Sequence, residues 1–257
     1  GSAVNAPILS SNKPFPVLIY SPGLGLAGEA GTFFFEYLAS RGYIVAAINH
    51  PGSSIFTEKT DGSFVFYQNE DYDTADNKVH LTQTRAIQLS QALDALLDLD
   101  RMPSSIFFNK MDTDHIGVFG HSIGGRTALR AASLDKRFKA AVNLDGSIED
   151  EPPYTFKDQN ILMMETDIDE TLKDELAAGT TKQDEVPQIK RVYSQYISNL
   201  FAAPCRKKYL VCYSGTRHIN YTDLPLLLNA PKFPVVDNQP LVGFNIIVPI
   251  RSVVFLS

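Results

Sequence analysis

The chain has 257 residues, of which 44% are hydrophobic and 20% charged, which is enough apolar sequence for one globular domain to bury a full core. Its net charge of −6, without a cluster of Lys and Arg, argues against nucleic acid as a partner, because binding to phosphates needs clustered cations. We expect one domain over residues 16–257. The polar leader over residues 1–15 opens with Gly1-Ser2, which resembles the remnant of a cleaved purification tag.

The leader lacks the charged and apolar regions of a signal peptide. The expected compartment is therefore secreted or periplasmic if an export signal has been removed, and cytoplasmic otherwise. The apolar stretch from Phe244 to Leu256 is shorter than the roughly 20 residues of a membrane span and contains Pro249 and Arg251, so we predict no transmembrane helix. The sequence does not indicate which oligomeric state the protein adopts.

Apolar runs alternate with helical periodicity through the first half of the chain. The predicted elements are a strand (16–20), a helix (30–40), a strand (43–48) and a long amphipathic helix (79–100) whose apolar side carries Ile87, Leu89, Leu93, Leu96 and Leu97. The first strand ends in the tight loop Ser21-Pro22-Gly23-Leu24-Gly25. The polar stretch near 51–78 is too long for an ordinary connection, which predicts an excursion with its own short hairpin or a cap.

The second half continues the alternation. The predicted elements are strands at 116–119, 138–144, 161–164 and 208–213, and helices at 123–134, 186–203 and 221–228. An acidic, polar insertion lies near 165–186. This order predicts an α/β fold with a mostly parallel central sheet and helices on both faces, in which ligands bind at the carboxyl ends of the strands.

A candidate nucleophile lies at one of these strand ends. Ser122 is the central residue of Gly120-His121-Ser122-Ile123-Gly124, a GxSxG motif between an apolar strand and an Ala-rich helix. GxSxG alone is common by chance, but this context is typical of the nucleophile turn of the α/β-hydrolase fold, where glycines let strand and helix cross closely. The alternative is a serine that merely caps the helix.

A serine nucleophile needs a histidine that takes its proton and returns it to the leaving group. Of the five histidines, His218 directly follows the last predicted strand, where the chain order Ser, acid, His of this fold places the base. His121 is interpreted as pointing away from the turn. His50, also at a strand end, is the weaker alternative base.

The acid that orients the histidine belongs at a strand end between Ser122 and His218. Asp145 follows the strand 138–144, and Asp167 follows the strand 161–164. Either aspartate satisfies this requirement, and either is also an ordinary residue to open a turn.

The chain resembles the plasma-type, calcium-independent platelet-activating factor acetylhydrolases and their bacterial relatives. The matching blocks are Pro16-Val-Leu-Ile-Tyr-Ser-Pro-Gly-Leu-Gly25, Tyr43-Ile-Val-Ala-Ala-Ile48, Gly120-His-Ser-Ile-Gly-Gly125, Arg137-Phe138 through Leu144-Asp145, and Gly215 to Asp223. The resemblance implies that Asp145 is the acid. Polyester hydrolases and many other members of the fold instead take the acid from the following strand, where Asp167 stands.

Two backbone N–H groups are expected to bind the oxyanion of the tetrahedral intermediate. The fold assigns one to Ile123, the residue after the nucleophile, and the resemblance assigns the other to Leu24. This chemistry needs neither a cofactor nor a metal, and we expect none. The chain departs from the family in carrying Pro22 where a histidine is common.

Together these features predict a serine carboxylic-ester hydrolase that works through an acyl-enzyme. The resemblance implies small-molecule or lipid ester substrates, namely short-chain acyl esters or (lyso)phospholipids, and allows peripheral contact with a lipid surface. One alternative is an esterase like the cutinases and polyester hydrolases, with Asp167 as acid. Others are a peptidase or amidase and a non-catalytic binding protein of the same fold.

Overall fold

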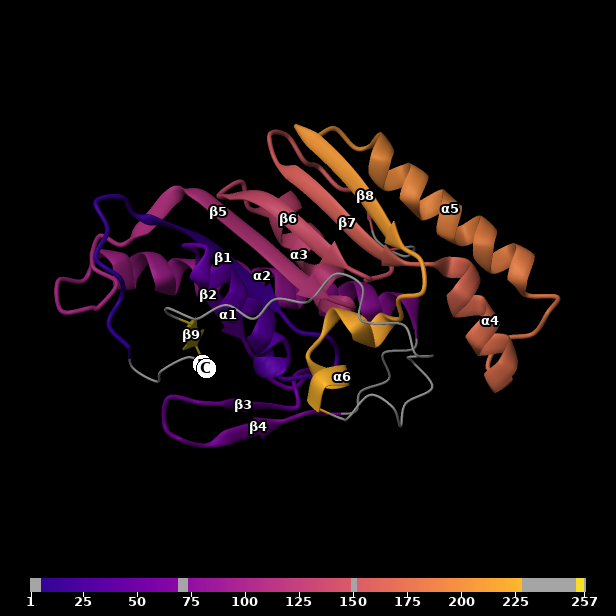
Figure 1. Cartoon of the computed structure of the whole chain (residues 1–257), viewed down its shortest axis with the longest axis horizontal. Coiled ribbons are helices and arrows are strands. Elements are labelled where there is room, and N and C mark those ends of the chain that lie inside the picture. The colour runs from indigo at the N-terminus through magenta and orange to yellow at the C-terminus, as the bar shows by residue number, and fades with distance from the viewer. Residues whose placement is uncertain (1–5, 69–73, 149–151, 228–252, 257) are drawn as a thin grey trace.

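The central element of the computed structural model, which describes residues 6–68, 74–148, 152–227 and 253–256, is a parallel sheet (Figure 1). Its seven strands lie in the order β8-β7-β6-β5-β1-β2-β9, and each neighbouring pair is parallel. They are β1 (Phe15–Ser21), β2 (Ile44–Ile48), β5 (Met111–His121), β6 (Phe138–Leu144), β7 (Asn160–Thr166), β8 (Lys207–Tyr213) and β9 (Val253–Leu256). The predicted α/β architecture is confirmed.

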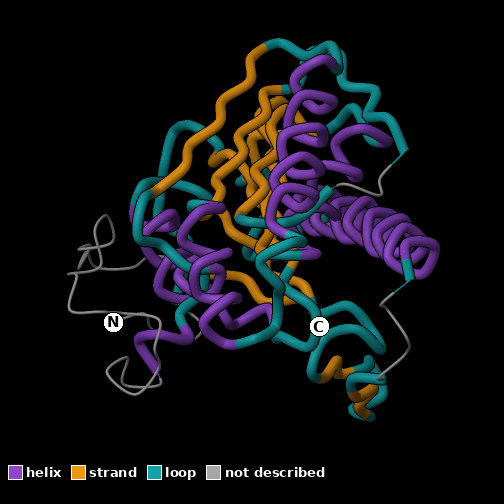
Figure 2. The backbone as a smooth tube through the Cα atoms, turned by 90° about the vertical axis from the view of Figure 1, so that its right-hand side faces the viewer, coloured by secondary structure: helices purple, strands orange, loops and turns teal. Residues whose placement is uncertain are grey.

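Helices cover both faces of this sheet (Figure 2). They are α1 (Thr32–Ser40), α2 (Ala75–Arg101), α3 (Ile123–Leu134), α4 (Ile168–Ala178), α5 (Val186–Ala202) and α6 (Leu224–Leu227), with 3-10 turns η1 (Gly28–Gly31) and η2 (His218–Tyr221). No helix in the described ranges is long and apolar enough to cross a membrane. Of the stretch Phe244 to Leu256, only β9 falls within those ranges.

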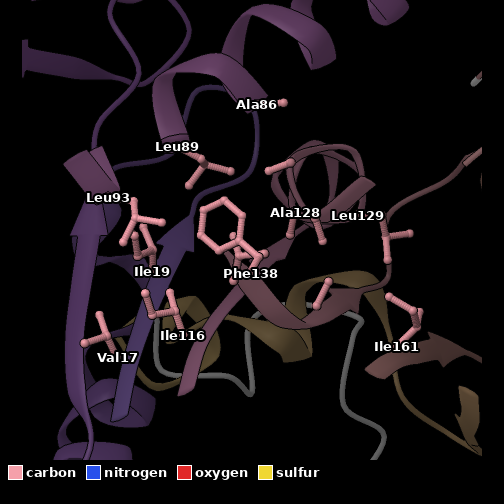
Figure 3. Close-up of a cluster of buried hydrophobic side chains, with 14 of the residues drawn as sticks. Val17, Ile19, Ala86, Leu89, Leu93, Ile116, Ala128, Leu129, Phe138 and Ile161 are labelled. Carbon is pink, nitrogen blue, oxygen red and sulfur yellow. The ribbon is translucent and has the colours of Figure 1, made fainter. Parts of the chain in front are cut away.

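The larger core lies between the sheet and the face formed by α2, α3 and α5. Figure 3 shows Leu89 and Leu93 of α2 directed toward Ile19 and Phe138 of the sheet, and all four side chains are buried. Each such side chain contributes roughly 2 kcal/mol by leaving water. On the opposite face, Phe35 of α1 packs against Tyr20, with ring centroids 4.7 Å apart. The sheet is therefore held rigidly from both sides.

The two polar excursions each contain regular structure. Within residues 51–78, β3 (Phe56–Glu58) and β4 (Phe64–Phe66) form an antiparallel hairpin, as predicted. Within 165–186 the chain forms α4, which the sequence did not predict. Asp167 caps this helix by accepting a hydrogen bond from Asp169 N at 3.0 Å, and Gly179 ends it with a positive φ of 73°.

Candidate active site

The residue between β5 and α3 has a strained backbone. Ser122 adopts φ 57° and ψ −129°, a conformation that costs a non-glycine residue about 1–3 kcal/mol. Its N–H donates to the carbonyl of Leu144 at 2.9 Å, which fixes the turn against the end of β6. The Ser122 residue is only half-buried, so solvent and ligands can reach it.

Glycines on both sides of Ser122 let the end of β1 approach this turn. A Cβ atom on Gly120 would lie 2.5 Å from the Ser21 carbonyl oxygen, and one on Gly124 would lie 2.0 Å from the same atom. Because real Cβ atoms do not come so close to backbone, neither position accepts a side chain. The loop that follows β1 is therefore brought against the start of α3.

His218 and Asp145, 73 residues apart in sequence, form a hydrogen-bonded pair at the same edge of the sheet. His218 Nδ1 lies 2.6 Å from Asp145 Oδ2; the aspartate side chain is 9% exposed and the histidine side chain 53% exposed. Because a carboxylate accepts, Nδ1 carries the hydrogen. The exposed imidazole therefore keeps Nε2 free to accept a proton.

The second carboxylate oxygen of Asp145 is also engaged. Oδ1 accepts hydrogen bonds from Thr166 N at 2.7 Å and from Thr166 Oγ1 at 2.9 Å. Burial alone would raise the pKa of Asp145, but the hydrogen bonds from His218 and Thr166 and the charge of His218 outweigh it and hold the pKa below its usual value. Asp145 is thus an ionised carboxylate with a fixed orientation.

Asp167 has a different role in the structure. Its carboxylate caps α4, and in the described part of the chain the carboxylate that is hydrogen-bonded to His218 is that of Asp145. Both ring nitrogens of His50 are engaged by residues other than Ser122. His50 is fully buried, with Nε2 2.9 Å from Ser21 Oγ and Nδ1 2.6 Å from Gln88 Oε1.

His121 contacts the candidate base, which the sequence did not predict. Its ring packs against that of His218 with centroids 4.4 Å apart, and its Nε2 lies 3.0 Å from the His218 carbonyl oxygen. Burial, and then the charge of His218, lowers the pKa of His121 to about 3. A neutral imidazole has one N–H, and here it is Nε2–H that donates to this carbonyl.

Two charged residues beside His218 tie its loop to helices. Arg217 forms ion pairs with Glu170, at 3.4 Å, and with Asp174, both on α4. Asp223 Oδ2 accepts a hydrogen bond from Phe33 N at 2.8 Å at the start of α1. Both residues belong to the segment that leads from β8 to α6. In Figure 1 this segment is gold and runs past the arrowheads of the central strands. Neither residue was predicted from the sequence to belong to the site.

The loop after β1 lies against Ser122. A Cβ atom on Gly23 would lie 3.1 Å from His121 Nδ1 and 3.5 Å from Ser122 Cβ, so this loop directly adjoins the turn. Within the described residues, no group accepts a hydrogen bond from the Leu24 N–H. The N–H of Ile123, at the first position of α3, has no acceptor there either, because the first N–H groups of a helix lack intrahelical partners.

We predict that Asp223→Asn stabilises the protein at neutral pH. Burial raises the pKa of Asp223 to about 6 from the usual 3.8, although the hydrogen bond from Phe33 N opposes this shift and Glu36 adds to it. Between about pH 4 and 6 the folded state therefore holds a proton that the unfolded chain has lost, so this carboxyl lowers stability as pH rises through that window. In urea unfolding, Asp223→Asn should gain about 2 kcal/mol over wild type at pH 7.5.

The stability gained by this variant should shrink toward zero as the pH falls to about 4 and below, where Asp223 becomes protonated in the unfolded chain as well as in the folded state. Asp114→Asn, at an exposed position of β5, serves as the control. A stability difference between Asp223→Asn and wild type that stays constant from pH 4 to 7.5 would contradict the prediction.

The chain is similar to several esterases. It is 32% identical over 166 residues to a platelet-activating factor acetylhydrolase from Canis lupus familiaris, an alignment that covers 55% of this chain and 37% of that protein. It is 30% identical over 133 residues to cutinase est2 from Thermobifida alba, covering 52% of this chain and 35% of that one. The alignments thus span little more than a third of these relatives.

A solved structure supports the fold. The ferulic acid esterase from Streptomyces cinnamoneus superposes with a TM-score of 0.62 and 24% sequence identity, over 89% of this chain and 59% of that one. The predicted α/β-hydrolase fold is therefore confirmed. The family model described as platelet-activating factor acetylhydrolase, isoform II, matches residues 2–233, which is most of the sequence. The chain belongs to the platelet-activating factor acetylhydrolase isoform II family.

Proposed function

We propose that this protein is a serine carboxylic-ester hydrolase with Ser122 as nucleophile, His218 as base and Asp145 as the acid that orients it. The observation that carries the proposal is the 2.6 Å pair of His218 Nδ1 and Asp145 Oδ2 at the same strand edge as the strained Ser122. A strained, half-buried serine at the same strand ends as a base oriented by a carboxylate fits the arrangement that acyl transfer uses.

The proposed reaction has two halves. Ser122 Oγ attacks the ester carbonyl while His218 Nε2 takes its proton, and His218 then gives that proton to the departing alcohol, which leaves an acyl group on Ser122. Water, activated by the same imidazole, releases the carboxylic acid. The amides of Leu24 and Ile123 would bind the oxyanion in both halves, at roughly 3 kcal/mol of barrier for each donor.

The proposed substrates are short-chain acyl esters, including those of glycerophospholipids and lysophospholipids. Support comes from family membership and from relatives named platelet-activating factor acetylhydrolase and probable 1-alkyl-2-acetylglycerophosphocholine esterase, the latter from Arthroderma benhamiae and 27% identical over 142 residues. The likeness to a cutinase favours a second candidate, a polyester hydrolase, so polymer hydrolysis belongs in the same assay.

A substrate panel with active-site labelling tests this proposal. We expect nitrophenyl esters from acetate to dodecanoate to be cleaved fastest at short chain length, followed by acetylated phospholipid, and a fluorophosphonate probe to label Ser122. Folded protein that is inert to every ester and unlabelled would instead be a binding protein. Cleavage of nitroanilides at rates comparable to those of nitrophenyl esters would indicate a peptidase or amidase.

A further inference from the structure

A buried arginine of α2 contacts the loop that carries Leu24. Arg85 is 1% exposed, and its Nη2 donates to the carbonyl oxygen of Pro22 at 2.7 Å. A Cβ atom on Gly124 would lie 2.6 Å from the same oxygen. The Pro22 carbonyl therefore lies between the guanidinium and the first turn of α3. Pro22 is two residues before Leu24, and Gly124 of α3 is two residues after Ser122.

A second chain of hydrogen bonds links the same helix to the preceding residue of the loop. Gln88 Oε1 lies 2.6 Å from His50 Nδ1, and His50 Nε2 lies 2.9 Å from Ser21 Oγ. Because a carbonyl oxygen only accepts, Nδ1 donates to Gln88 and Nε2 accepts the Ser21 hydroxyl hydrogen. Burial, and then the charge of Arg85, holds the pKa of His50 far below its usual value, so the imidazole stays neutral and keeps this pattern.

Burial of the Arg85 guanidinium costs free energy. Moving a guanidinium out of water carries a penalty that hydrogen bonds only partly offset, and apolar side chains of similar size often stabilise such sites equally well. The hydrogen bond from Arg85 Nη2 and the chain from Gln88 through His50 end on consecutive residues, Pro22 and Ser21. They therefore restrain the position and direction of the peptide groups that follow.

We propose that Arg85 is a positioning residue for the oxyanion-binding amide of Leu24. Gln88 and His50 support the same loop through Ser21. The inference rests on the proposed function, because it concerns how tightly the developing oxyanion is bound. A displacement of a catalytic donor by about 1 Å can lower a rate 100-fold. Hydrogen bonds to Ser21 and Pro22 fix the loop just before Leu24, so the donor keeps its position during turnover.

Arg85→Met, which keeps an unbranched apolar stem and removes the guanidinium, tests the role on a nitrophenyl ester. We expect kcat to fall roughly 10- to 100-fold with KM changed less than about 3-fold, because the oxyanion exists only in the transition state. The affinity for an alkylboronic acid, which forms a tetrahedral adduct on serine, should fall in proportion to kcat/KM. Arg85→Lys, which restores a donor, should recover part of the loss.

Arg130→Met is the matched control. Arg130 is also a buried arginine, 5% exposed, that donates to a proline carbonyl, Pro152 O at 2.5 Å, but it lies two helical turns from Ser122. It should lose thermal stability and keep wild-type kcat. Should Arg85→Met fail to fold, Arg85→Lys decides the question, with a kcat between those expected for wild type and Arg85→Met. Gln88→Met and Ser21→Ala each remove one contact of the second chain of hydrogen bonds.

Two outcomes separate this inference from the proposed function. Active wild-type enzyme together with folded Arg85, Gln88 and Ser21 variants that keep its kcat and its boronate affinity would overturn the positioning role alone. Wild-type protein that neither hydrolyses the ester nor reacts with a fluorophosphonate would overturn the proposed function, and the positioning role with it.

Discussion

Ser122→Ala and His218→Ala are each expected to lower kcat for ester hydrolysis about 10⁶-fold, and the double variant is expected to lose no more than either single one. The two side chains perform one proton-coupled attack, so removing either abolishes the same step. A residual rate about 10³- to 10⁴-fold above that in water should remain, because the oxyanion-binding amides are backbone groups and stay in place. Steady-state kinetics on a nitrophenyl ester measures all three variants.

His115→Asn provides the control for these variants. His115 is exposed on β5 and pairs with Asp112 at 2.8 Å, away from the strand end that carries Ser122. Its substitution should leave kcat unchanged. Losses that multiply in the double variant would show that the two side chains do not act in one step, and substantial activity in Ser122→Ala would show that another group is the nucleophile.

Local patterns were sufficient for most of the fold. The helix 123–134 was predicted with the bounds that α3 has, because a GxSxG turn starts it and its apolar periodicity ends at Leu134. Helix α4 was missed because its sequence is acidic and only Leu172 is fully buried, so no apolar stripe marks it. Ile87 was assigned to the apolar side of α2 but is 56% exposed. Two residues along a helix correspond to a rotation of about 200°, so Ile87 lies on the side opposite to the buried Leu89.

The site was predictable where it depends on strand ends and not where it depends on contacts between distant segments. Ser122 and His218 follow strands, and their candidacy needs only the chain order. The contacts of Arg85, Arg217 and Asp223 join segments remote in sequence, which no local pattern encodes. The position of His121 could have been predicted. Side chains alternate along a strand, so His121 lies on the same face of β5 as Phe119. Phe119 packs on the α1 side of the sheet, where Tyr221 of the His218 segment also packs.

Asp145→Asn is expected to lower kcat about 10⁴-fold, and Asp167→Asn to leave it within about 2-fold of wild type. Asparagine presents one acceptor and one NH₂ group, whereas Asp145 accepts from His218 Nδ1 with one oxygen and from Thr166 with the other. One of these donors must then face an NH₂ group, so the imidazole loses the tautomer that leaves Nε2 as acceptor. Kinetics on a nitrophenyl ester, with labelling of Ser122 by a fluorophosphonate, measures both variants.

The comparison is balanced because asparagine is about as good an N-cap as aspartate, so Asp167→Asn keeps the hydrogen bond from Asp169 N and with it helix α4. Through Arg217, α4 holds the loop of His218, and a variant that unfolded α4 would lose activity for reasons unrelated to acid function. Loss of activity in Asp167→Asn with a folded α4, and not in Asp145→Asn, would mean that His218 turns to the following strand during turnover, as in the polyester-hydrolase alternative. The opposite result would assign the acid to the carboxylate whose two oxygens already accept three hydrogen bonds, one from the imidazole and two from Thr166.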